Sequence, residues 1–159
     1  MSAIQRAGPD AAAALSALHS RAFPPAEAWD TAAFTALLAL ETSWVYTANS
    51  ASAVQGLMVL QVTEMEADLL TVCVDPACQR AGLGRGLMLF GMDALCQSGV
   101  KMLRLDVAAD NAAAIAFYRA FGFDEDGRRL KYYRRGNGVR VDGVLMSRSL
   151  AGHGATKKA

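Results

Sequence analysis

The amino-acid sequence predicts a mixed α/β fold in which helices cover both faces of one sheet. Three strand-like segments follow one another between Trp44 and Val74, an order typical of an antiparallel meander. Two helical segments, one with apolar residues at helical spacing and one marked by its capping residues and a following glycine, then alternate with a further strand-like segment between Gly82 and Ala120. A sheet and helices that each bury one apolar face assemble into layers, so these observations indicate a layered α/β domain.

The expected strands are short runs of apolar and β-branched residues that end at turn-forming residues. They comprise 2–6, 44–48, 56–62, 68–74, 100–107 and a closing pair at 132–133 and 143–148. In the segment 100–107, apolar Leu103 and Leu105 alternate with polar Arg104 and Asp106, as in a half-buried strand. The turn Gly136-Asn137-Gly138 indicates that the closing pair is a hairpin.

The expected helices begin and end at residues that favour helix termini. They comprise a segment from Pro9-Asp10 to the Pro24-Pro25 pair, 31–40 with Thr31 as its cap, 82–98 with Gly99 as its stop, and a last helix to about Ala120. Asp110 or Asn111 would cap that last helix. The loop 23–29 carries two prolines and two aromatic residues, which would either line a pocket or anchor the helix corner.

Length and composition indicate one globular domain without a polyanionic partner. The 159 residues suit one hydrophobic core, and 53% of them are apolar while 19% are charged. We therefore expect a single domain over 1–150 and a mobile tail over 151–159. A net charge of +1 argues against nucleic-acid binding. The sequence has neither a signal-peptide pattern nor an apolar run of about 18 residues, so we expect a cytoplasmic protein that binds no membrane.

The cysteines and histidines do not predict a metal site. Cys73, Cys78 and Cys96 match neither a zinc spacing nor a Cys-x-x-Cys redox pair, so we expect them to fill apolar space. His19 and His153 have no ligand partner at a useful spacing and receive no predicted role.

The segment 72–85 predicts an anion-binding turn between a strand and a helix. Helix N-termini present unpaired N–H groups and about half a positive charge, so they bind phosphates readily. Gly82 and Gly84 let the backbone approach a phosphate, and Arg80 and Arg85 add positive charge. Neither a P-loop nor a dinucleotide fingerprint fits, because Gly84 is followed by Arg85-Gly86 and position 87 is leucine. A pyrophosphate suits this turn, and a plain phosphate-binding domain is an alternative.

Two motifs in this order resemble those of the GNAT acetyltransferase superfamily. The stretch Gln-Arg-Ala-Gly-Leu-Gly at 79–84 resembles its coenzyme A signature, and 105–118, followed by Gly122-Phe123, resembles its downstream strand and helix. Within the superfamily the chain is most similar to bacterial ribosomal-protein-alanine N-acetyltransferases, a resemblance that also involves Tyr132-Tyr133, Asp142 and Met146 and covers about 44–148. It implies the GNAT fold, with a mostly antiparallel sheet of six to seven strands.

The resemblance also implies direct transfer of an acetyl group from acetyl-CoA to a primary amine, without a metal. Strand residues 72–74 would pair with the pantetheine arm, and one N–H there would stabilise the thioester oxygen. Asn111 would contact the coenzyme near its reactive end, although it is equally suited to cap a helix. The implied coenzyme-binding residues are Val72, Cys73, Val74, Gln79, Arg80, Ala81, Gly82, Leu83, Gly84, Arg85 and Asn111.

The same resemblance implies two catalytic residues. Tyr118 would be the general acid, because a phenol with an ordinary pKa near 10 is protonated at pH 7 and can protonate the departing thiolate. Asp106 stands where similar enzymes carry a glutamate base. Aspartate is one methylene shorter, so proton abstraction through a water is expected. The alternatives are that Tyr118 only packs its helix and that Asp106 is a solvated carboxylate.

The expected acceptor is a protein N-terminal α-amine. At pH 7 its deprotonation costs about 1 kcal/mol, against about 4.6 kcal/mol for lysine, so a weak base suits it better. Glu64, Glu66 and Asp68 would share one strand face and attract a cationic acceptor, or form a solvated hairpin tip. A small-molecule amine is the alternative acceptor, and a coenzyme-A-binding regulatory module with little activity is the alternative class. The oligomeric state, monomer or homodimer, stays open.

Overall fold

The computed structural model describes residues 3–79 and 81–151. Arg80 of the expected coenzyme loop and residues 152–159 of the expected tail lie outside the described residues.

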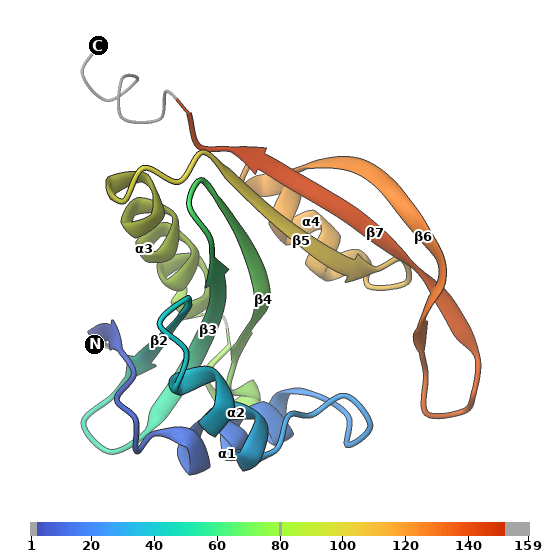
Figure 1. The fold of residues 1–159 in the computed structure, drawn as a ribbon. Coiled ribbons are helices and arrows are strands. Elements are labelled where there is room, and N and C mark those ends of the chain that lie inside the picture. The colour runs from blue at the N-terminus through green and yellow to red at the C-terminus, as the bar shows by residue number, and fades with distance from the viewer. Residues whose placement is uncertain (1–2, 80, 152–159) are drawn as a thin grey trace.

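One sheet forms the centre of the molecule (Figure 1). In the described ranges it has seven strands in the order β1-β2-β3-β4-β5-β7-β6. They are β1 (Ala3–Arg6), β2 (Ser43–Asn49), β3 (Val54–Val62), β4 (Glu66–Val74), β5 (Met102–Ala108), β6 (Asp124–Arg134) and β7 (Arg140–Ser149). Neighbouring strands are antiparallel except β4 and β5. This mostly antiparallel sheet confirms the predicted architecture.

The parallel pair β4 and β5 holds together only at its beginning. Its register runs from Glu66 opposite Met102 to Leu69 opposite Leu105 and stops there. Leu70 is an extra residue in the pairing of β4 with β3, because Leu69 and Thr71 pair with consecutive residues of β3. Such a bulge bends a strand and increases its twist. Beyond Leu69 the two strands diverge, and Figure 1 shows the gap between their ribbons widening from there.

Helices cover both faces of the sheet, as the sequence predicts. The structure has α1 (Ala12–Ala22) and α2 (Thr31–Leu38) on one face, and α3 (Leu83–Gln97) and α4 (Ala112–Ala120) on the other. The expectation that Thr31 caps α2 is wrong: Asp30 is the cap, since its carboxylate accepts the Ala33 N–H at 2.8 Å. Both residue types cap helices well, so the sequence pattern did not separate them.

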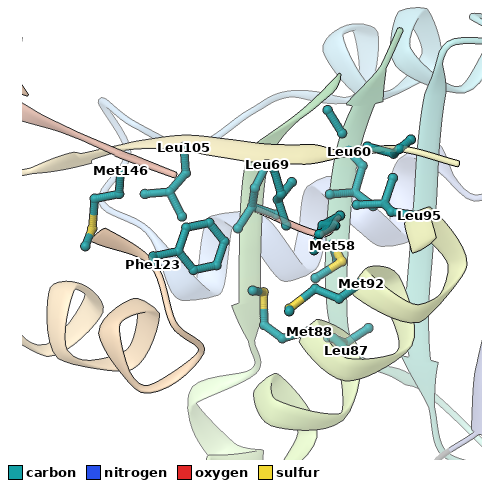
Figure 2. Packing of buried hydrophobic residues seen from close by; sticks show 14 of the residues in the cluster. Met58, Leu60, Leu69, Leu87, Met88, Met92, Leu95, Leu105, Phe123 and Met146 are labelled. Atoms are coloured by element: carbon teal, nitrogen blue, oxygen red, sulfur yellow. The ribbon is translucent and has the colours of Figure 1, made fainter. Parts of the chain in front are cut away.

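The main hydrophobic core lies between α3 and the face of the sheet that α3 covers (Figure 2). Leu87, Met88, Met92 and Leu95 of α3 pack against alternate residues of β2 to β4. The same cluster continues through Leu105, Phe123 and Met146 at the other half of the sheet. A second cluster buries Leu15, Leu18 and Phe34 against the opposite face of β2 to β4. The core therefore spans the divergence of β4 and β5 on one face only.

The closing hairpin is much longer than the sequence indicates. The segment expected at 132–133 is part of the 11-residue β6, most of whose side chains are exposed, so no alternation of apolar and polar residues announces it. Its pairing with β7 is interrupted between Arg129 and Tyr133. Within that interruption Lys131 has a φ of 50° and donates its N–H to the Asp142 carboxylate at 2.9 Å. Along the described residues, no helix has the length and apolar character to cross a membrane.

Candidate active site

Two cavities flank the divergence of β4 and β5. One, the α3 cavity, has a volume of about 490 Å³ and is lined by the end of β4, the start of α3, one side of α4 and Phe23. The other, the hairpin trough, has a volume of about 930 Å³ and is lined by β4, β5 and the β6–β7 hairpin. The end of the β4–β5 pairing lies between the two cavities, and β4 lines both of them.

The α3 cavity contains most of the residues expected to bind the coenzyme. Those that line it are Val72, Cys73, Val74, Gln79, Gly82, Leu83, Gly84 and Arg85. Ala81 belongs to the same turn but is not among the lining residues, and Arg80 lies outside the described residues. The β3 side of 72–74 is paired, whereas pairing with β5 has ended, so one backbone edge of this segment faces the divergence.

The turn before α3 brings helix N–H groups to this cavity. A short 3-10 helix, η1 (Pro76–Cys78), follows β4, and the Asp75 carboxylate caps it by accepting the Ala77 N–H at 3.0 Å. Arg21 of α1 binds Asp75 at 3.0 Å. Gly82 then adopts a φ of 79°, which is unstrained for glycine and directs the chain into α3. The N-terminus of α3 therefore presents unpaired N–H groups where an anion can bind.

The cysteines are free thiols, and the one in the α3 cavity is a poor nucleophile. Burial raises the pKa of Cys73 to about 12, and the Asp75 carboxylate adds to this increase. A thiol with this pKa is protonated at pH 7, and the thiolate is the reactive form. Among the described residues, no group of three or more His, Cys, Asp or Glu is placed to hold a metal ion.

Tyr118 lines the α3 cavity from α4. Its ring packs edge-on against Phe117 and Phe123, with ring centroids 5.5 and 5.9 Å away. Burial raises the pKa of Tyr118 to about 12, and Tyr133 and Cys73 add to the increase. The phenol therefore holds its proton throughout the physiological pH range.

Asn111 is placed differently from the other expected coenzyme contacts. It precedes α4, and its side-chain oxygen accepts the Ala114 N–H at 3.1 Å as the helix cap. It is not among the residues that line either cavity. Its observed contact is thus the capping one.

Asp106 lies in the hairpin trough, one residue beyond the last pair of β4 with β5. It is opposite Leu145 of β7 and shares its strand face with Arg104. Of the three acidic residues expected on one face, Asp68 lines the trough, whereas Glu66 pairs with Arg104 at 2.7 Å and Glu64 lies in the exposed turn before β4. Burial and the nearby Asp106 and Glu66 raise the pKa of Asp68, against the opposing effect of Arg104.

Tyr133 is a candidate site residue to which the sequence analysis gives no role beyond its part in the family resemblance. It lines the trough, and burial followed by the charge of Asp106 raises its pKa to about 12. It also contributes to the raised pKa of Tyr118. Gly143 gives Tyr132 and Tyr133 room, since a Cβ there would lie 3.2 and 3.3 Å from their rings. The available signal was the Tyr132-Tyr133 pair in a mostly charged strand.

His19 is the second residue whose place the sequence did not reveal. Its Nδ1 accepts the Trp29 N–H at 3.0 Å, so the ring proton is on Nε2, which faces the Thr71 hydroxyl at 3.2 Å. Its ring also stacks on Phe23 and Trp29. The loop 23–29 is therefore both anchored at a helix corner and, through Phe23, part of the cavity wall.

Comparison with known proteins extends these observations. The sequence model of the acetyltransferase (GNAT) family matches residues 12–123. The chain is 45% identical over 89 residues to the ribosomal protein bS18-alanine N-acetyltransferase of Escherichia coli, a match that covers 56% of the chain and 60% of that relative's length. It is 34% identical over 121 residues to the N-alpha-acetyltransferase RimI of Mycobacterium tuberculosis, which covers 74% of the chain and 75% of the relative.

A solved structure is similar to the chain over almost its whole length. The crystal structure of a ribosomal-protein-alanine N-acetyltransferase from Escherichia coli superimposes with a TM-score of 0.87 and 33% sequence identity, covering 94% of each chain. The structural match covers 94% of the chain, against 56% for the sequence match. With a family model that matches most of its length and a diverged parallel strand pair beside a glycine-containing helix start, the chain belongs to the acetyltransferase (GNAT) family.

Proposed function

We propose that this protein transfers the acetyl group of acetyl-CoA to the N-terminal α-amine of a protein. The observation that carries the proposal is the pair of cavities on either side of the diverging strands. One has the helix start and open strand edge that suit a coenzyme, and the other has carboxylates that suit an amine. Family membership and the names of the relatives support the same activity.

The α3 cavity would hold the coenzyme. Its pyrophosphate would lie at the N-terminus of α3, against the backbone of 81–84 and the side chain of Arg85. The arm would run along the open edge of Val72, Cys73 and Val74, where a backbone N–H would stabilise the oxyanion that forms on the thioester carbonyl. Gln79 and Leu83 would complete the wall. Arg80 is part of the proposed set through the motif alone, and Asn111 would act by holding the start of α4.

The hairpin trough would bring in the acceptor. Asp106 would accept a proton from the ammonium group, directly or through a water. The neutral amine would attack the thioester carbonyl carbon, and the carbon–sulfur bond would break as the amide forms. Tyr118 would give its proton to the departing thiolate. The raised pKa of Tyr118, about 12, keeps the phenol protonated at pH 7 but also makes it a weaker acid than an ordinary tyrosine, so the proton would move only as negative charge develops on the sulfur. The nitrogen would release its second proton to water, and Tyr118, after it has acted, would regain a proton from water.

The α-amine is the acceptor that this site suits best. Its deprotonation costs about 1 kcal/mol at pH 7, about a quarter of the cost for a lysine side chain. The relatives' names specify a protein alanine or an N-alpha position, in agreement with that preference. Side chains of Asp68, Tyr132 and Tyr133 along the trough would contact the residues that follow the amine.

Thiol release from acetyl-CoA tests the proposal. The panel comprises peptides with a free N-terminus, the same peptides with a blocked N-terminus and one internal lysine, and small amines such as polyamines. We expect turnover with the free N-terminus only. Turnover restricted to small amines would refute the acceptor assignment. Tight acetyl-CoA binding without turnover on any amine would instead indicate a coenzyme-binding regulatory module.

A further inference from the structure

Arg135, next to the tip of the β6–β7 hairpin, joins three segments that are far apart in the sequence. Its Nη1 donates to the Glu27 carboxylate at 3.2 Å, across 108 residues of chain. Its Nε donates to one oxygen of Asp110 at 3.2 Å, and its Nη2 contacts the other. One guanidinium thus binds a carboxylate from the α1–α2 loop and a carboxylate from the β5–α4 loop.

Each of the three segments supplies part of the candidate active site. The α1–α2 loop begins with Phe23, which lines the α3 cavity. Asp110 directly precedes the cap of α4, the helix that carries Tyr118. The strand that leads into Arg135 carries Tyr132 and Tyr133, which line the trough. The bridge therefore connects the walls of both cavities.

The geometry of the Arg135 contacts indicates that they restrain the three segments, unlike most ion pairs on a protein surface. The Arg135 side chain is only 25% exposed, and it binds Asp110 through both carboxylate oxygens. Planar, two-pronged contacts of arginine with carboxylates are stronger and more directional than single ion pairs. Most exposed ion pairs contribute little, but one that orders three loops also removes their conformational freedom.

We propose that Arg135 is a positioning residue that holds the hairpin, the α1–α2 loop and the β5–α4 loop in the arrangement that presents the acceptor amine to the thioester. The inference rests on the proposed function, since it concerns the acceptor side of the same site. Arg135 acts through the segments that it joins and touches no reacting atom. Its loss should therefore weaken productive binding of the acceptor while binding of acetyl-CoA at the start of α3 is preserved.

Two substitutions and a matched control test this inference. Arg135→Ala removes the bridge, and Arg135→Lys keeps the charge but can engage the carboxylates only as a point charge. Arg134→Ala removes the same charge one residue earlier, from an exposed side chain that makes no ion pair with the described residues. For each protein, the KM of a free-N-terminal peptide, the dissociation constant of acetyl-CoA, the thermal midpoint and the hydrogen exchange of 24–30 and 109–112 are measured.

For Arg135→Ala we expect the peptide KM to rise about tenfold or more, because charge-assisted hydrogen bonds of this kind are lost. Acetyl-CoA binding should stay within about twofold of wild type, since the α3 turn is untouched. Amides in both loops should exchange faster, Arg135→Lys should recover part of each effect, and Arg134→Ala should match wild type.

Other outcomes overturn the inference. Equal peptide KM values for Arg135→Ala and Arg134→Ala would refute the positioning role while leaving the proposed function intact. Equal losses of acetyl-CoA binding, peptide binding and thermal midpoint in Arg135→Ala, with no recovery in Arg135→Lys, would mean that Arg135 only stabilises the fold. Absence of turnover by the wild-type protein on every amine would overturn the proposed function and this inference together.

Discussion

Tyr118 lines the α3 cavity and Asp106 lines the hairpin trough, on either side of the point where β4 and β5 diverge. Burial raises the pKa of Tyr118 to about 12, so the phenol is protonated at pH 7, as the proposed acid must be. Asp106 instead lies at an exposed position of β5, where an ammonium group and water can reach it.

Replacement of Tyr118 by phenylalanine tests the acid role. Phe keeps the ring packing against Phe117 and Phe123, so the fold and acetyl-CoA binding should be retained. We expect kcat to fall by about 10²-fold to 10⁴-fold, the usual contribution of a general acid. The rate of thiol release from acetyl-CoA at saturating peptide measures kcat. Tyr46→Phe, which removes a buried phenol on β2, is the control and should leave kcat unchanged. Equal rates for Tyr118→Phe and wild type would assign Tyr118 to packing.

His19 should make the protein less stable in mild acid. Burial lowers the pKa of His19 from 6.5 to about 4, so the folded state favours the neutral ring. Its contribution to stability is fully present above pH 6.5 and is lost as the pH falls through about 4. The free energy of unfolding of wild type, relative to His19→Gln, should therefore decrease by about 3 kcal/mol between pH 7 and pH 4. Denaturant titrations of both proteins at pH 7 and pH 4 measure this difference in the free energy of unfolding. An equal difference at the two pH values would contradict the prediction.

The α3 start is the element on which coenzyme binding should depend most. A Cβ on Gly84 would lie 3.7 Å from Phe117 and from Val74, which are ordinary contacts, so alanine fits the fold but projects into the α3 cavity. Alanine in a helix is also favoured over glycine by about 1 kcal/mol.

Gly84→Ala should therefore separate stability from binding. We expect an unchanged or higher thermal midpoint together with acetyl-CoA binding that is weaker by about tenfold or more, because the backbone N–H groups no longer reach the phosphate. Calorimetry of binding and of unfolding measures both. Gly86→Ala is the matched control: it lies in the same turn, and its Cβ would meet Ile4, 3.4 Å away, instead of the cavity. Equal affinities for the two variants would place the pyrophosphate elsewhere.

At the scale of the whole molecule, the sheet has two halves, β1-β2-β3-β4 and β5-β7-β6. They are joined by four residue pairs between the parallel strands β4 and β5. The core on the α3 face nevertheless joins both halves, from Leu60 and Leu69 to Leu105 and Met146 (Figure 2). A shared core couples the unfolding of the parts that it connects. The single domain predicted from chain length should thus be visible as one transition.

We expect tryptophan fluorescence and far-ultraviolet circular dichroism to report the same midpoint in urea. Both tryptophans, Trp29 and Trp44, lie in the first third of the chain, whereas circular dichroism reports on all elements. Acetyl-CoA at 100 times its dissociation constant should add about 2.7 kcal/mol to the free energy of unfolding, and its removal should reverse the gain. Two separated midpoints would indicate that the β5–β7–β6 half unfolds independently.

The sequence by itself determined most of the elements and the region of the candidate site. Helical spacing located α3 and alternating residues located β5, because each of these elements buries one face, whereas α4 was located by its capping residues and the glycine after it. The glycine turn at 82–84 identified the candidate coenzyme-binding segment, since local backbone geometry and helix termini are written in neighbouring residues. The edge strand β6 was largely missed because its mostly exposed side chains carry no periodic signal.

Only the tertiary structure decided which residues face each other across the site. The two cavities lie where β4 bulges at Leu70 and where its pairing with β5 ends after four residue pairs. No residue type in the sequence indicates either feature. The bridge from Arg135 to Glu27 and Asp110 joins residues up to 108 positions apart, and the pocket of His19 combines α1, β4 and a loop. Contacts of this kind depend on how elements pack, and local sequence patterns describe one element at a time.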